Sequence, residues 1–126
     1  MSWFMKKILV AEDDRNLSKS IDTWLTLEGF EVVTVYNGGE ALNKLLHQKY
    51  DLLITDIAMP HLNGLELINE IRRINPTLPI MVVSGKLNQE LVEDLQQLGV
   101  NYILSKPIKP IEFRKMIETV FDGTLH

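Results

Sequence analysis

The segment Asp51–Pro60 reads Asp-Leu-Leu-Ile-Thr-Asp-Ile-Ala-Met-Pro, so an apolar run ends in the carboxylate of Asp56 and is followed by a turn. A second apolar run, residues 8–11, also ends in acidic residues, Glu12-Asp13-Asp14. Two strands that both end in carboxylates predict a site of concentrated negative charge. Such a site favours a hard divalent cation, and a phosphoryl group binds readily beside that cation.

Short apolar runs alternate with segments of helical periodicity along the whole chain. Predicted strands cover residues 8–11, 31–35, 52–55, 80–83 and 102–104. Between and after them, apolar residues recur every three or four positions, which is typical of amphipathic helices. The apolar positions of the five predicted helices are Leu17, Ile21, Trp24 and Leu25; Ala41, Leu42, Leu45 and Leu46; Leu65, Ile68, Ile71 and Ile74; Leu91, Val92, Leu95 and Leu98; and Phe113, Met116, Ile117, Val120 and Phe121.

Strict alternation of strands and helices predicts an α/β fold: a parallel, doubly wound sheet with helices on both faces and right-handed crossovers. The runs at residues 8–11, 52–54 and 80–83 are continuously apolar, as expected for strands buried on both faces. We find no internal repeat or linker, and 126 residues suit one domain. Either Met1 or Met5 could be the natural start, and residues 1–4 are an N-terminal extension in the second case.

Polar residues follow four of the predicted strands. Glu12 and Asp13 follow the first, Asp56 the third, Ser84 the fourth and Lys106 the fifth. In a doubly wound sheet, ligands bind beyond the carboxyl ends of the strands. We therefore expect these side chains to meet in one crevice.

Composition excludes several classes of protein. The net charge of −4 does not suggest a nucleic-acid surface, and the chain has no cysteine for disulfides or thiolate metal sites. The absence of cysteine fits a reducing compartment, so we expect a cytoplasmic location. No segment approaches the roughly 20 apolar residues that span a bilayer, and the N-terminus is not a signal peptide.

The chain resembles the receiver domain of two-component response regulators over nearly its whole length. The resemblance rests on Glu12-Asp13, on Asp56 with Met59-Pro60 and Gly64, on Ser84, and on Lys106-Pro107, in this order and spacing. It implies a flavodoxin-like sheet with strand order 2-1-3-4-5. It also implies a phosphoacceptor that switches a partner-binding surface and is not a turnover enzyme.

The resemblance assigns a role to each of these residues. Asp56 is expected to accept the phosphoryl group, and Lys106 and Ser84 to contact the phosphoryl oxygens. The implied Mg²⁺ ligands are Glu12 (through water), Asp13, Asp56 and the backbone carbonyl of Ala58. Without a cation, one of the crowded carboxylates should have a raised pKa. The Lys106-Pro107 peptide is expected to be cis.

Other interpretations stay open for several residues. Asp56 alone could cap the following turn, and Ser84 could bond only to backbone. Asp14, outside the matched pair, is better explained as the N-cap of the helix that begins near Asn16. His47, His61 and His126 lack metal-ligand spacing and are expected at the surface.

Position 103 departs from the family pattern. The family has Tyr or Phe three residues before the lysine, where this chain has Ile103, and Tyr102 lies one residue earlier. Adjacent strand residues point to opposite faces, so Tyr102 cannot take over that role. We expect Ser84 and Ile103 to be the switch positions, with less dependence on an aromatic ring.

The resemblance implies a histidine kinase or histidine phosphotransfer protein as donor, and a downstream effector domain or protein as target. Neither nucleic acid nor membrane is an expected partner of this segment. Two alternative functions stay open. One is that of a phosphatase, which would need a general acid at position 58, and the other is that of an interaction module that does not depend on phosphorylation. We expect a single-domain regulator or the receiver part of a longer protein.

Overall fold

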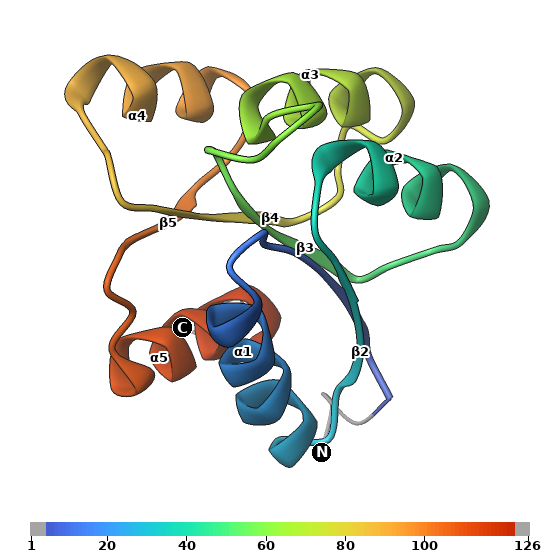
Figure 1. Cartoon of the computed structure of the whole chain (residues 1–126), viewed down its shortest axis with the longest axis vertical. Coiled ribbons are helices and arrows are strands. Elements are labelled where there is room, and N and C mark those ends of the chain that lie inside the picture. Colours follow the sequence, from blue (N-terminus) through green and yellow to red (C-terminus); the bar gives the residue numbers. More distant parts are fainter. Residues whose placement is uncertain (1–4, 123–126) are drawn as a thin grey trace.

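The computed structural model describes residues 5–122, and strands and helices alternate strictly over these residues (Figure 1). The expected N-terminal extension, residues 1–4, and His126, which was expected at the surface, lie outside the described part. The elements in order are β1 (Lys7–Ala11), α1 (Arg15–Leu27), β2 (Glu31–Val35), α2 (Gly38–His47), β3 (Leu52–Asp56), α3 (Gly64–Ile74), β4 (Ile80–Ser84), α4 (Gln89–Gln97), β5 (Tyr102–Ser105) and α5 (Pro110–Asp122).

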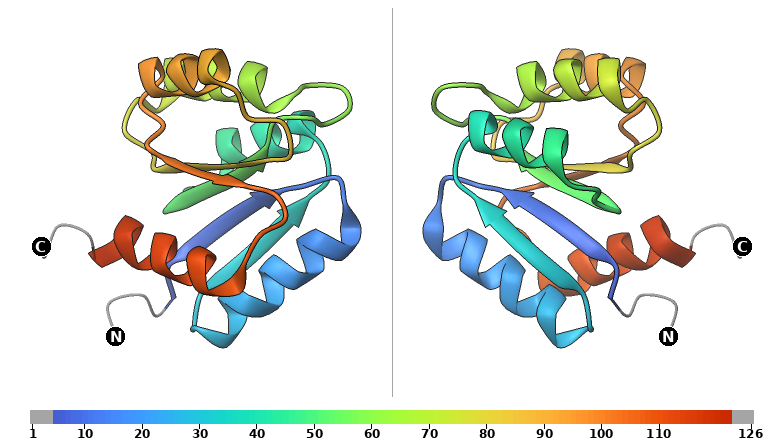
Figure 2. Two further views of the ribbon diagram at one scale, coloured as in Figure 1. Left: turned by 90° about the vertical axis from the view of Figure 1, so that its left-hand side faces the viewer. Right: turned by 90° about the vertical axis from the view of Figure 1, so that its right-hand side faces the viewer.

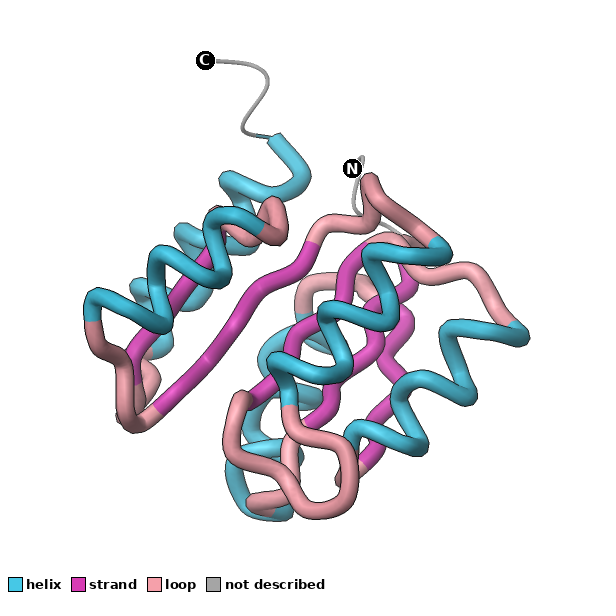
Figure 3. The backbone as a smooth tube through the Cα atoms, turned by 90° about the horizontal axis from the view of Figure 1, so that it is seen from above, coloured by secondary structure: helices cyan, strands magenta, loops and turns pink. Residues whose placement is uncertain are grey.

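All strand pairs are parallel, and the strand order is β2-β1-β3-β4-β5. This confirms the predicted α/β fold and its 2-1-3-4-5 order. Helices α2, α3 and α4 cover one face of the sheet, and α1 and α5 cover the other (Figures 1 and 2). Seen from above, the strands run side by side between the two helical layers, with connecting loops at their ends (Figure 3).

The central strands are buried on both faces, as their continuous apolar runs predicted. Every residue of β3 and β4 is buried. Neighbouring strand residues enter different cores: Leu9 packs in the cluster under α2, α3 and α4, whereas Ile8 and Val10 pack in the cluster under α1 and α5. The sheet thus separates two hydrophobic cores. Its central strands are continuously apolar because neither of their faces is solvated.

Three strands, β3, β4 and β5, end one residue later than predicted. The ladder continues through the pairs Asp56↔Val83 and Ser84↔Ser105, so Asp56 and Ser84 are the last strand residues rather than the first loop residues. Parallel pairing with a neighbour extends the strand beyond its apolar run, because backbone hydrogen bonds do not depend on the polarity of the side chain. The side chains therefore stand on the rigid sheet rather than on a loop.

Helix ends follow the local chemistry of the sequence. The Asp14 side chain accepts hydrogen bonds from the amides of Asn16 and Leu17, which confirms it as the N-cap of α1. Gly29 and Gly99, which follow α1 and α4, have φ of 97° and 77°, a backbone conformation that favours glycine. Among the described residues, no helix combines the length and the apolar character needed to cross a bilayer.

Candidate functional site

The carboxyl ends of β1, β3, β4 and β5 stand next to one another at one edge of the sheet. The register aligns Ala11 with Thr55, and Asp56 with Val83. Residues at or just beyond these ends therefore converge, as predicted from the strand ends in the sequence. This edge holds Glu12, Asp13, Asp56, Ser84 and Lys106.

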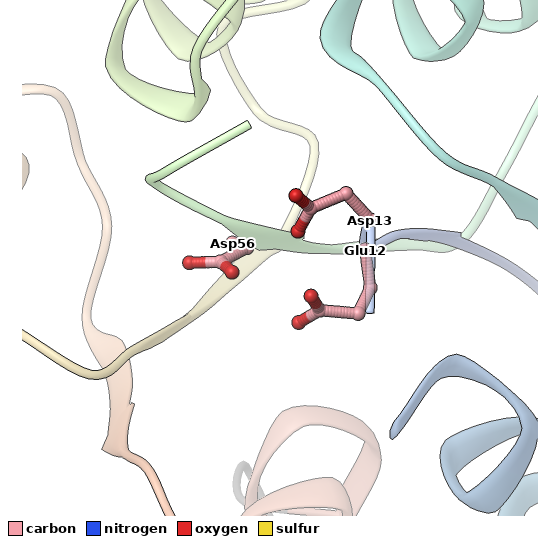
Figure 4. Close-up of side chains that lie close together, drawn as sticks. All are labelled: Glu12, Asp13 and Asp56. Carbon is pink, nitrogen blue, oxygen red and sulfur yellow. The ribbon is translucent and has the colours of Figure 1, made fainter. Parts of the chain in front are cut away.

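Three carboxylates form the acidic part of the site. One oxygen from each of Glu12, Asp13 and Asp56 lies within 4.8 Å of the others. Glu12 and Asp13 leave the end of β1 on opposite sides, and Asp56 projects from β3 beside them (Figure 4). Glu12 and Asp56 are buried, whereas Asp13 is exposed. Two of the three charges thus lie where water screens them poorly, and the third is open to solvent.

Lys106 supplies a positive charge to this cluster. Its Nζ atom lies 2.6 Å from Oδ2 of Asp56 and 3.0 Å from Oε1 of Glu12. The backbone amide of Lys106 donates to the Ser84 carbonyl at 2.9 Å, which ties the residue to the end of β4. The Lys106-Pro107 peptide is cis, as the resemblance implied. The lysine is therefore shared between the two buried carboxylates.

Burial raises the pKa of Glu12 from 4.5 to about 7, and the charge of Asp56 adds to this rise. Hydrogen bonds from the Asp14 amide and from Lys106 act in the opposite direction but do not outweigh burial. The expectation that one of the crowded carboxylates has a raised pKa is met by Glu12.

Lys106 shows the complementary effect. Burial alone would lower the pKa of Lys106, but its hydrogen bonds to Asp56 and Glu12 outweigh burial and raise the pKa above 10.5. The ammonium is therefore charged throughout the physiological pH range.

The backbone after Asp56 binds its carboxylate. The amides of Ile57 and Ala58 donate to Oδ1 of Asp56 at 2.7 and 3.2 Å. Oδ1 is thus held by two amides while Oδ2 faces Lys106, so the carboxylate has one fixed orientation. These amides could not be identified from the sequence as part of the site, because backbone donors leave no mark in the residue types.

Gly64 allows the first turn of α3 to approach Asp56 closely. A Cβ atom on Gly64 would lie 2.1 Å from the backbone oxygen of Asp56, and the Gly64 amide donates to the Ile57 carbonyl at 2.9 Å. This contact explains why the segment after Pro60 needs glycine at this position. It closes the β3–α3 loop, residues 57–63, into a tight turn.

Ser84 is buried at the end of β4, beside the acidic cluster. Its hydroxyl oxygen accepts a hydrogen bond from the Lys86 amide at 3.2 Å. This contact agrees with the interpretation of a serine bonded to backbone, and it leaves the hydroxyl proton available for a second partner. Gly85 and Lys86, the next two residues, are exposed.

Tyr102 and Ile103 pack on opposite faces of the sheet. Ile103 packs against the cluster under α2, α3 and α4, whereas Tyr102 packs against the cluster under α1 and α5. The expectation that Tyr102 cannot replace an aromatic ring at position 103 is confirmed by this arrangement. His47 and His61 are both exposed, as expected.

The donor chemistry fits a hard divalent cation. The clustered side chains of Glu12, Asp13 and Asp56 offer only carboxylate oxygens, which Mg²⁺ prefers over nitrogen or sulfur ligands. The exposed Asp13 gives the site an open side where water could complete the ligand shell. The site can therefore hold a metal ion, while Lys106 already balances part of the negative charge.

Comparisons with known proteins agree with this geometry. The model of the response regulator receiver domain family matches residues 8–118. A CpxR homolog described as a transcriptional regulatory protein, from Haemophilus influenzae, is 37% identical over 117 residues, which cover 92% of this chain and 50% of that protein. The chain thus spans about half the length of this curated relative.

Two solved structures are similar over almost the whole chain. The CheY-like receiver domain protein of Methanospirillum hungatei is 27% identical with a TM-score of 0.90, covering 94% of this chain and 95% of that one. The receiver domain of the sensor histidine kinase PA1611 from Pseudomonas aeruginosa is 28% identical with a TM-score of 0.84, covering 94% and 98%. The latter has a magnesium ion coordinated in its active site cleft.

Proposed function

The chain belongs to the response regulator receiver domain family, and from this premise we propose that it accepts a phosphoryl group on Asp56 in a reaction that depends on Mg²⁺. It is a receiver of two-component signal transduction. The observation that carries the proposal is the convergence of Asp56 with two further carboxylates and Lys106 at one edge of the sheet.

The proposed reaction is an in-line phosphoryl transfer from a phosphohistidine. A carboxylate oxygen of Asp56 attacks phosphorus, a P–O bond forms, and the P–N bond to the donor imidazole breaks. The leaving nitrogen takes up a proton, and the product is an acyl phosphate. The amides of Ile57 and Ala58, which bind Oδ1, fix the direction of attack.

Glu12 (through water), Asp13, Asp56 and the Ala58 carbonyl are the proposed ligands of the metal ion. Bound there, Mg²⁺ would neutralise the crowded carboxylates and polarise the phosphoryl oxygens. The residues fit this role because the three side chains bring one oxygen each within 4.8 Å. The magnesium in the similar PA1611 receiver supports the choice of metal.

Lys106 and Ser84 are the proposed contacts of the transferred group. Lys106 already lies 2.6 Å from the attacking carboxylate, so its charge is placed where negative charge develops. The Ser84 hydroxyl would donate its free proton to a phosphoryl oxygen. Movement of Ser84 toward that oxygen, followed by repacking at Ile103, is the proposed switch toward a partner-binding surface.

The proposed activity is that of a switch rather than of a turnover enzyme. A phosphatase that used Asp56 as nucleophile would need a general acid at position 58, and that residue is alanine. The chain would assist only its own phosphorylation and hydrolysis. The small side chain of the exposed Ala58 leaves room for a water molecule to attack the acyl phosphate.

The proposed partners follow from the chemistry. A histidine kinase or histidine phosphotransfer protein would supply the phosphoryl group, and an effector domain or protein would bind the switched surface. Neither nucleic acid nor membrane is proposed as a ligand of this segment, whose net charge is −4. The proposed location is the cytoplasm, where such donors act.

Incubation with acetyl phosphate and Mg²⁺ tests the phosphorylation site. Intact mass spectrometry should show one added phosphoryl group that is stable in acid and labile in base. Asp56→Asn should abolish the addition, whereas Asp94→Asn, which removes an exposed carboxylate on α4, should leave it unchanged. Equal labelling of Asp56→Asn and the unmodified chain would overturn the assignment.

A further inference from the structure

The start of α2 lies directly against the loop that carries the amides bound to Asp56. Gly38 is the first residue of α2 and is buried. A Cβ atom at this position would lie 2.0 Å from the backbone oxygen of Leu62, 2.8 Å from its carbonyl carbon and 2.9 Å from its Cβ. The neighbour that leaves no room is therefore backbone, which cannot turn aside as the end of a flexible side chain can.

Leu62 belongs to the β3–α3 loop, whose other end is also held by a glycine. The Gly64 amide binds the Ile57 carbonyl, and the Gly64 Cα lies against the backbone of Asp56. Within this loop, Met59 is buried and Asn63 forms a capping box with Glu66. The contact with Gly38 comes from a different part of the chain, the start of α2.

Local hydrogen bonds fix the backbone conformation at the start of α2. The Asn37 side chain accepts from the Glu40 amide at 2.8 Å, and Glu40 in turn accepts from the Tyr36 amide at 3.0 Å. Ala41, one turn into α2, is fully buried in the core. Because the clash is with backbone, a side chain at position 38 would push the start of α2 and the β3–α3 loop apart.

We propose that Gly38 is a positioning residue of the phosphorylation site, because its missing side chain lets α2 fix the loop that aims the Ile57 and Ala58 amides at Asp56. This inference rests on the proposed function and deepens it. It assigns to the start of α2 an effect on metal binding and phosphoryl transfer, although no side chain there needs to touch the metal ion or the phosphoryl group.

Gly39, the next residue, supplies a matched control. It is exposed, and a Cβ atom there would meet only the Asn37 side-chain oxygen at 3.3 Å. Both substitutions to alanine place the same new methyl group in the same helical turn, so their effects on helix propensity are similar. A difference between the two variants therefore reports the contact with Leu62.

The test compares Gly38→Ala with Gly39→Ala by amide NMR and by calorimetric titration with Mg²⁺. Gly38→Ala should shift the Ile57 and Ala58 amide resonances and weaken Mg²⁺ binding roughly tenfold, as loss of a group that supports metal ligands does. Gly39→Ala should do neither. A folded Gly38→Ala protein with unchanged resonances and unchanged Mg²⁺ affinity would overturn the inference.

A second measurement covers the case in which Gly38→Ala does not fold. When Mg²⁺ is added to the unmodified protein, the amide resonance of Gly38 should shift together with those of Ile57 and Ala58, because the three lie along one set of backbone contacts. A Gly38 resonance that does not respond while those of Ile57 and Ala58 shift would contradict the inference. If the unmodified chain takes up no phosphoryl group, the proposed function fails, and the amide resonances still decide the role of Gly38.

Discussion

The Nζ atom of Lys106 lies 2.6 Å from Oδ2 of Asp56, although 50 residues separate the two in sequence. The same ammonium lies 3.0 Å from Glu12, so one cation balances two buried carboxylates. The two acids repel each other and lose hydration, and Lys106 offsets part of both costs. The stability of the domain and the proposed reactivity of Asp56 therefore depend on the same side chain.

Lys106→Met is expected to lower the free energy of unfolding by about 3 kcal/mol at pH 8 in EDTA, the lower end of the range for breaking a buried ion pair. The change leaves Glu12 and Asp56 without their shared cation. Urea unfolding would measure it. Lys109→Met, which removes an exposed lysine, should change stability by less than about 0.5 kcal/mol. Equal losses in the two variants would contradict the ion-pair argument.

Glu12 should make the domain less stable as pH rises from about 5 to 7. The pKa of Glu12 is about 7 in the folded protein against 4.5 in the unfolded chain, so the folded state binds more protons in this window. The free energy of unfolding then falls as the carboxyl ionises, and this contribution levels off above pH 7. Unfolding in EDTA across this range would reveal the slope.

Glu12→Gln should remove that part of the slope, because the amide does not titrate. Glu90→Gln, at an exposed position on α4, is the control and should keep the slope of the unmodified protein. If Glu12→Gln and Glu90→Gln gave the same pH dependence, Glu12 would not be the responsible group.

Gly64→Ala should destabilise the domain by about 3 kcal/mol and impair labelling of Asp56, because the new methyl group overlaps the Asp56 backbone oxygen. Chemical unfolding and the rate of acetyl phosphate labelling would measure the two effects. Gly85→Ala is the control, since its nearest neighbour would be the Lys106 side chain at 4.0 Å. A Gly64→Ala protein as stable as Gly85→Ala would show that the loop relaxes freely.

In β5, phosphorylation should change the packing of Ile103 and not that of Tyr102. Ile103 packs on the layer of α2, α3 and α4, whereas the Tyr102 ring packs on the layer of α1 and α5. Adding a phosphoryl mimic with Mg²⁺ should shift the Ile103 methyl resonances more than the Tyr102 ring resonances in NMR spectra. A large, slow reorientation of the Tyr102 ring would count against this expectation.

The fold and the main side chains of the site could be predicted from the sequence, because both are indicated by the types of residue at their positions. The apolar runs before Glu12 and Asp56 marked buried strands, and apolar residues at every third or fourth position marked the helices. Because parallel strands end at the same edge of the sheet, the polar residues that follow them could be expected to meet there. The strand ends at Asp56 and Ser84 were missed by one residue, because backbone pairing carries no signal in polarity.

Contacts made by backbone atoms could not be predicted from the sequence. The Arg72 guanidinium donates to the carbonyls of Leu98 and Leu78 at 2.6 and 2.8 Å and so ties α3 to the end of α4. Nothing in the sequence marks those carbonyls as acceptors. The close approach of Gly38 to Leu62 is hidden for the same reason, since a glycine at a helix start has several common explanations.

The buried sheet also keeps the packing of one helical layer separate from that of the other. Since neighbouring residues of β1 and β5 enter different cores, a substitution under α2, α3 and α4 needs no compensating change under α1 and α5. The two helical layers can therefore diverge independently during evolution, beside the same unaltered cluster of carboxylates. A designer who wishes to redirect one surface can leave the opposite layer as it is.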